Sequence, residues 1–308
     1  MRKTWDPAHH YSAQVHARLF QVVAPVGGSI ENNNSSENMN NISFGKISSG
    51  KSPNEIRKES FLTWLKDIFC PNFKYTSIIF ILTCIDLITY IITLFFGIKR
   101  TNTELLAPLY QTLDLFGMKI PAKIYRGQIH RLILFGILHA NLVHLISNLF
   151  SQIILGFFLE DLIGNFKLSI LYLLSNIFGG LFSSVMNQAA GVGASVAIFG
   201  ILGGFFGFTV INWETVKNNF NYLMNLIFLI IIVIANASIG VGSETIDNFG
   251  HLGGLIYGFL FIFVLIEPKN GNRSSLWMEF DTWKKYAIIL ICASIALLII
   301  VFWLFQNH

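Results

Sequence analysis

Seven long apolar stretches alternate with polar segments along this chain. They cover residues 75–97, 142–160, 167–187, 195–211, 222–240, 248–266 and 283–305. Each stretch is about 17 to 23 residues long, and a helix of that length crosses a hydrocarbon layer of roughly 30 Å. Because lipid offers no water to bind free backbone groups, we expect every stretch to be a helix. The pattern predicts an all-α polytopic membrane protein.

The polar segments divide the chain into three parts. Residues 1–72 hold a run rich in Asn, Ser and Glu without apolar periodicity, which predicts a disordered tail. An organellar presequence is a weaker alternative for its first thirty residues. Residues 73–266 hold six predicted spans and a long loop at 98–141, part of which we expect to pack as a substructure of its own. Residues 267–308 form a linker and the seventh span.

Basic residues orient the predicted spans, because cytoplasmic loops are rich in Lys and Arg. Nine of them precede the first span, and four follow the sixth span, two in the linker and two at the start of the seventh span. The loops after the third and fifth spans have none. We therefore predict a cytosolic N-terminus and an exoplasmic C-terminus, in the plasma membrane or a secretory-pathway membrane. The loop 98–141 is an exception, since it places six basic residues on the exoplasmic side.

Composition excludes several classes of protein. Charged residues make up 12% of the chain and hydrophobic residues 53%, whereas globular domains carry about 25% charged residues. A soluble enzyme is therefore excluded. The three cysteines do not form a disulfide framework or a zinc-site spacing, and the net charge of +4 is too diffuse for nucleic-acid binding. We expect the lipid bilayer as a partner, and neither nucleic acid, metal nor cofactor.

Polar residues of the even-numbered spans are expected to lie at a similar depth. His144, Ser195 and His251 stand near the starts of the second, fourth and sixth spans, which enter the membrane from the same side. Ionisable groups in lipid are costly and mark candidate sites. Ser195 follows Gly193 at a predicted helix N-terminus, where free N–H groups favour a developing negative charge. A serine nucleophile needs a base, and His251 is the candidate. Helix packing is the alternative for a lone membrane serine.

Glycines in the fourth and sixth spans are spaced for close helix contact. The fourth span has Gly200 and Gly204, and the sixth has Gly250, Gly254 and Gly258. Small residues four apart let two backbones approach closely. The serine and the histidine need that approach to come within about 2.6–3.2 Å. Plain helix packing without chemistry is the alternative.

Two further pairs share a helix face with these groups. Phe199 is four residues after Ser195 and could support the imidazole ring, with core packing as the alternative. His144 and Asn148 are also four apart, and their side-chain donors could stabilise the oxyanion of an acyl-transfer intermediate. An interhelical polar pair is the alternative for these two residues.

These residues resemble the rhomboid family of intramembrane serine proteases. The similarity runs from about Arg131 to Gly258. Residues 139–148 are similar to the H-A-N-x-x-H-x-x-x-N segment of eukaryotic secretase-type rhomboids. Residues 193–195 resemble the nucleophile motif, and residues 250–254 resemble the general-base motif. Six core helices with a seventh at the C-terminus also resemble the secretase subclass.

The resemblance implies a serine endopeptidase with a Ser195–His251 dyad. It implies that His144, Asn148 and the backbone N–H of Ser195 form the oxyanion hole. Its implied substrates are single-span transmembrane proteins whose helix unwinds near the exoplasmic end. Entry is expected to be lateral, near the fifth span and the loop 98–141.

The resemblance also suggests supporting residues and shows departures. We expect Arg131 to take the place of the family's loop Trp-Arg motif and to contact Glu160. The residues expected to support the site are Arg131, Glu160, Phe199, Gly193, Gly254 and Gly258. His130 stands where the family has Trp, and Val196 stands where it usually has Gly after the serine. Val196 could crowd the first helical turn or the approach of the substrate.

Two other classes of function are alternatives. A catalytically silent rhomboid-fold protein would bind or escort membrane clients, and Val196 is its only support. A transporter predicts paired mid-membrane charges and repeats, whereas the spans hold Asp86 and no repeat. We expect Asp86 to face the helix bundle and to hydrogen-bond a neighbouring helix.

Overall fold

The structure, a computed structural model, describes residues 75–99, 104–217, 226–227, 230–231, 247–267 and 279–306. These residues form helices and no strand. Five helices are long and apolar enough to cross a membrane: α4 (Ile78–Phe95), α8 (Leu142–Ile163), α9 (Asn165–Met186), α13 (Asn248–Leu265) and α14 (Phe280–Gln306). A sixth apolar helix, α10 (Ser195–Ile211), is shorter, with 17 residues. The predicted all-α polytopic fold is confirmed.

Some sequence predictions fall on other parts of the chain. The predicted tail at 1–72 lies outside the described residues. Most of the predicted fifth span, 222–240, also lies outside them, apart from helical residues at 226–227 and 230–231. The seventh predicted span corresponds to α14.

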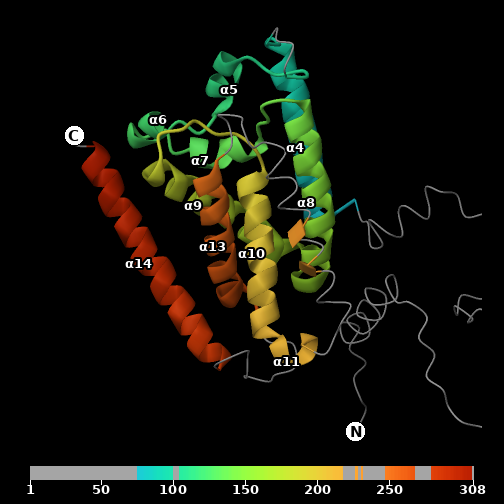
Figure 1. Cartoon of the computed structure of the whole chain (residues 1–308), viewed down its shortest axis with the longest axis vertical. Coiled ribbons are helices and arrows are strands. Elements are labelled where there is room, and N and C mark those ends of the chain that lie inside the picture. The colour runs from blue at the N-terminus through green and yellow to red at the C-terminus, as the bar shows by residue number, and fades with distance from the viewer. Residues whose placement is uncertain are drawn as a thin grey trace, which may run out of the picture. The chain divides into compact units, whose positions relative to one another are not determined.

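Helix α10 is the centre of the described bundle (Figure 1). It packs most extensively against α13 and also contacts α9 and α8. Thirteen of its 17 residues are buried, as expected for a helix that is apolar on all sides. Helix α4 packs against α8, and α14 packs against α13. One hydrophobic cluster connects the long helices.

Glycines bring the backbones of α10 and α13 into direct contact. A Cβ atom on Gly254 would lie 2.1 Å from the carbonyl oxygen of Val196. A Cβ atom on Gly258 would lie 2.0 Å from the carbonyl oxygen of Gly200. Side chains at these positions would collide with main-chain atoms of α10, so the predicted small-residue contact between the two helices is present.

The segment between α4 and α8 forms a substructure with short helices. These are α5 (Tyr110–Phe116), α6 (Pro121–Tyr125), α7 (Arg131–Leu134) and the 3-10 helix η1 (Phe135–Ile137). Helix α5 ends at Gly117, which has a φ of 105°, a backbone conformation that favours glycine at this position. A second apolar cluster packs here around Leu113, Met118 and Leu138. Part of loop 98–141 thus forms a substructure of its own that packs against the bundle, as expected.

The predicted contact between Arg131 and Glu160 is wrong. Glu160 caps the start of α4: its carboxylate accepts from the Ser77 hydroxyl at 2.7 Å and from the backbone N–H groups of Ile78 and Ile79 at 3.1 and 3.3 Å. Free N–H groups at a helix start favour a carboxylate there. Glu160 also lies 18 residues beyond the first residue of α8, roughly 27 Å at about 1.5 Å per residue. Arg131 precedes that helix, so the two residues belong to opposite ends of it.

Arg131 instead braces the loop that contains it. Its guanidinium donates to the backbone carbonyl of Met118 at 2.7 Å and to the side chain of Gln128 at 2.7 Å. It also forms an ion pair of 2.9 Å with Asp114. Arg131 therefore holds α5, the segment after it and α7 together, even though its predicted partner is elsewhere.

Asp86 faces the bundle, and its predicted hydrogen bond to a neighbouring helix is confirmed. The side-chain amide of Gln152 in α8 donates to the Asp86 carboxyl group at 2.9 Å. The amide oxygen of Gln152 in turn accepts from the hydroxyl of Tyr172 in α9 at 2.7 Å. This chain of polar contacts connects α4, α8 and α9 in the buried interior.

Candidate active site

Ser195 and His251 meet across the interface between α10 and α13. Ser195 is the first residue of α10, and His251 lies in the first turn of α13. The Ser195 Oγ and His251 Nε2 atoms are 2.7 Å apart. The two residues are 56 positions apart in the chain, and the close packing of these helices brings them together. A hydroxyl at this distance from an imidazole nitrogen can transfer its proton to that ring.

The imidazole ring of His251 is held from one side by an aromatic ring. Phe199, one turn after Ser195 on α10, stacks on it with 4.4 Å between ring centroids and 6° between ring planes. Only 9% of the His251 surface is exposed. The stacked ring limits rotation of the imidazole, so Nε2 stays directed at the serine. This is the place that the sequence predicted for Phe199.

His144 and Asn148 approach the same point from α8. Asn141 begins that helix by accepting a hydrogen bond from the His144 N–H at 2.9 Å. A Cβ atom on Gly193 would lie 2.8 Å from the Nε2 of His144 and 3.3 Å from the Nδ2 of Asn148. Gly193 has a φ of 128°, where side chains are strained. Both donors therefore lie against the space that a side chain two residues before Ser195 would occupy, and glycine fits there because it has none.

Asn148 has an unused donor at this point. Its Nδ2 is buried and has no hydrogen-bond partner among the described residues. A buried donor without a partner costs about 1–3 kcal/mol. The N-terminus of α10 beside it has no side-chain cap. The arrangement thus offers unpaired hydrogen-bond donors next to the serine, which suits an oxygen that becomes negatively charged.

His139 is a buried neighbour of the site to which the sequence motif assigned no separate role. It is fully buried, and neither ring nitrogen has a hydrogen-bond partner among the described residues. Its ring packs edge-on against the ring of His144, with centroids 5.5 Å apart. His139 therefore limits the orientation of His144. Its position five residues before His144 was the only feature of the sequence that could have indicated this contact.

Val196 lies in a helix interface rather than over the serine. It is 1% exposed. A Cβ atom on Gly179 of α9 would lie 2.5 Å from its Cγ1, and one on Gly250 of α13 would lie 2.9 Å from its Cγ2. The valine methyl groups fill space that these glycines leave open. The expected crowding is relieved by the missing side chains of the neighbouring helices.

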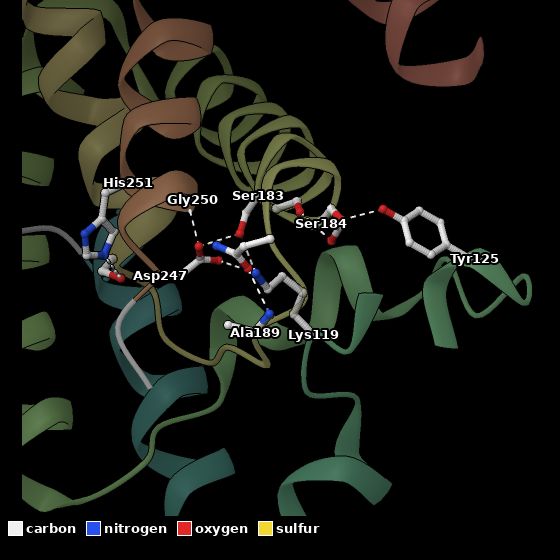
Figure 2. Close-up of polar contacts among 11 residues, drawn as sticks. Lys119, Tyr125, Ser183, Ser184, Ala189, Asp247, Gly250 and His251 are labelled. Atoms are coloured by element: carbon white, nitrogen blue, oxygen red, sulfur yellow. Dashed lines mark hydrogen bonds and ion pairs between the residues drawn. The ribbon is translucent and has the colours of Figure 1, made fainter. Parts of the chain in front are cut away.

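A buried polar network beside His251 was not predicted. The amine of Lys119 donates to the Asp247 carboxylate at 2.6 Å and also to the Ser183 hydroxyl. Figure 2 shows these three side chains converging next to the turn that carries Gly250 and His251. Burial lowers the pKa of Lys119, and the carboxylate of Asp247 opposes that shift. An Asp at the start of a span predicts a helix cap, as Asp247 does. No nearby residue in the sequence indicates that Lys119 is its cationic partner.

In the described part of the chain, His, Cys, Asp and Glu side chains do not gather in groups of three or more that could bind a metal ion. Glu160 is the one predicted supporting residue that lies at the far end of α8. Arg131 lies in the loop that also holds Lys119. His251, His144, Asn148, Phe199, Gly193 and Gly254 lie around Ser195, and Gly258 lies further along the interface against Gly200.

Comparison with known proteins gives consistent matches. The profile of the rhomboid domain matches residues 126–268. RHOMBOID-like protein 1 of Arabidopsis thaliana is 38% identical over 173 residues, which are 55% of this chain and 43% of that protein. Rhomboid-like protease 1 of Toxoplasma gondii is 34% identical over 228 residues, 73% of this chain and 75% of that protein. Rhomboid-like protease 2 of Toxoplasma gondii is 31% identical over 202 residues, 65% and 68% of the two chains. The chain thus spans less than half of the plant protein.

Proposed function

The chain belongs to the rhomboid family of intramembrane proteases, and on that premise we propose that it is a serine endopeptidase that cleaves membrane proteins with a Ser195–His251 dyad. The observation that carries this proposal is the 2.7 Å separation of Ser195 Oγ and His251 Nε2. Both groups needed for nucleophilic attack on a carbonyl are present and in contact.

The reaction follows from the positions of these two groups. Ser195 Oγ attacks the substrate carbonyl carbon while its proton passes to Nε2 of His251. The tetrahedral intermediate collapses when His251 returns that proton to the leaving amine, and Ser195 is left as an ester. Water then attacks the ester, with His251 as base, and releases the acid product. Phe199 keeps the imidazole in place in this scheme, so no acidic residue is required to orient it.

His144, Asn148 and the N–H of Ser195 are the proposed oxyanion donors. The support is the position of His144 and Asn148 against Gly193 and the unpaired buried donor on Asn148. A donor of this kind acts most strongly when charge develops on the substrate oxygen, and its loss typically costs about 10²–10³ in rate.

The proposed substrates are single-span transmembrane proteins. A helical substrate keeps its carbonyl groups in hydrogen bonds, so the segment to be cleaved must unwind before Ser195 can attack it. We place the cleavage near the exoplasmic end, because the predicted topology puts the starts of α10 and α13 on that side. The cytosolic N-terminus and a plasma or secretory-pathway membrane belong to the same proposal.

The catalytically silent alternative loses its single support. Val196 had been expected to crowd the first helical turn or the approach of the substrate, but its side chain packs between helices α9, α10 and α13. This residue therefore gives no reason to expect an inactive protein.

The test is cleavage of a single-span reporter by the full-length protein in proteoliposomes. Wild type should cleave it and should react with a fluorophosphonate probe, whereas Ser195→Ala and His251→Ala should do neither. Each variant's abundance and melting temperature are measured alongside, so that loss of activity is separated from loss of the fold. Equal cleavage by wild type and Ser195→Ala would refute the proposal.

A further inference from the structure

We propose that Lys119 is a positioning residue that sets the distance between Ser195 and His251. The inference rests on the proposed function. Lys119 lies in the segment between α5 and α6, far in sequence from either residue, and its side chain is fully buried. Its amine reaches the start of the helix that carries the histidine, and its backbone holds the segment that leads to the serine.

The amine acts on the histidine side through Asp247. Lys119 Nζ is 2.6 Å from one Asp247 oxygen. The other oxygen accepts from the backbone N–H of Gly250 at 2.8 Å, which caps the first turn of α13. The backbone N–H of His251 also donates to the carbonyl of Asp247, at 2.9 Å. Ser183 of α9 accepts from the amine and donates to the carboxylate. The turn that holds His251 is thus attached to Lys119.

The backbone of Lys119 acts on the serine side. Its N–H donates to the carbonyl of Gly191, and the N–H of Gly191 donates back to the carbonyl of Lys119, both at 3.0 Å. Gly191 lies four residues before Ser195. A Cβ atom on Gly191 would lie 3.2 Å from Lys119 Cε and 3.4 Å from Asp247 Oδ2. The segment before the serine therefore packs directly on the ion pair.

One side chain consequently connects the approaches to both members of the dyad. Lys119 connects Gly191 to Asp247 through its two backbone bonds and its amine. Catalysis depends steeply on the position of reacting groups, and a 1 Å displacement costs on the order of 10²-fold in rate. Loss of the amine should therefore slow the chemical step and leave substrate binding largely intact. Loss of a surface cation should change neither the chemical step nor substrate binding.

The experiment measures kcat and KM for full-length variants in proteoliposomes with the single-span reporter, together with the rate of fluorophosphonate labelling. Lys119→Met keeps the length of the side chain and removes the amine. Asp247→Asn keeps an oxygen for the Gly250 N–H and removes the charge. Lys99→Met is the matched control, because it removes an exposed lysine that pairs with Glu104 in the same loop.

We expect Lys119→Met to lower kcat at least tenfold with KM within twofold of wild type, and to slow probe labelling by a similar factor. The double variant Lys119→Met/Asp247→Asn should lose no more than the worse single variant, because the two residues act as one unit. Lys99→Met should match wild type. If Lys119→Met does not accumulate, Asp247→Asn and its labelling rate carry the same expectation.

Several outcomes would overturn the inference. A kcat within twofold of wild type for both Lys119→Met and Asp247→Asn would do so. A raised KM with unchanged kcat would indicate a substrate contact instead, and fully additive losses would indicate two independent roles. If wild type itself shows no Ser195-dependent cleavage, the proposed function fails and this inference fails with it. An active wild type with an unaffected Lys119→Met removes only the inference.

Discussion

Replacing Gly254 with alanine is expected to separate the serine from the histidine. The new Cβ atom would lie 2.1 Å from the carbonyl oxygen of Val196, whereas real Cβ contacts essentially never fall below 3.0 Å. The oxygen belongs to the main chain of α10 and cannot rotate away. Helices α10 and α13 must therefore separate by about 0.9 Å at this point, the difference between the two distances.

That displacement falls next to the reacting atoms. Val196 follows Ser195 directly, and Gly254 lies one turn after His251. If the shift is transmitted in full, the distance from Oγ to Nε2 grows from 2.7 Å to about 3.6 Å, where a hydrogen bond is lost. A misplacement of about 1 Å costs on the order of 10²-fold in rate. We expect Gly254→Ala to lower kcat by about that factor.

Gly204→Ala is the matched control for this variant. Gly204 lies in α10, and a Cβ atom there would meet Leu171 Cδ2 at 2.7 Å and Leu159 Cδ2 at 3.2 Å. These atoms end flexible side chains, which can move aside. Each Gly→Ala change stabilises its helix by up to about 1 kcal/mol through intrinsic propensity. This effect is the same in both variants and cancels in their comparison. Reporter cleavage and thermal unfolding are measured for both. A kcat of Gly254→Ala within threefold of the control would refute the reasoning.

Three further substitutions test other parts of the structure. Asn148→Ala should lower kcat by about 10²–10³ with little change in melting temperature, because its donor has no partner to lose; unchanged cleavage would exclude the oxyanion role. Glu160→Ala should lower the free energy of unfolding by about 2 kcal/mol through the freed donors of α4, and a change in kcat without a change in stability would contradict this. Val196→Gly should destabilise the protein by on the order of 2–3 kcal/mol without raising kcat; a large gain in cleavage would mean that Val196 restrains the site.

The positions of the membrane helices were predictable because bilayer thickness and backbone pairing leave few choices. The predicted start of the second span, residue 142, and that of the sixth, residue 248, agree with the first residues of α8 and α13. The fourth span agrees with α10 at both ends. Because these starts were predicted correctly, the positions of Ser195 and His251 relative to their helix starts placed them at a similar depth. The glycine spacing then predicted that the two helices would approach closely.

The wrong contact between Arg131 and Glu160 has a simple physical cause. Arg131 precedes a 22-residue helix and Glu160 lies near the end of that helix, so the helix length, which the rise per residue determines, separates them. The family resemblance named both residues as supports of the site, but it gave no information on how far apart they lie. Val196 is a different case. The space for its methyl groups comes from the missing side chain of Gly179 on α9, and the sequence does not show that α9 packs against Val196.

Lys119 illustrates why the remaining part of the site needed the folded chain. In the sequence it was one of six basic residues in a loop predicted to be exoplasmic, an exception to the charge rule to which no role was assigned. Its two polar side-chain partners lie 64 and 128 residues later, on separate helices. No periodicity or motif relates residues at such distances, because they meet only after the helices have packed. In the proposed function the motif residues supply the reacting groups, and we propose that their positions depend also on a residue outside every motif. A mutational scan restricted to the motifs would miss it.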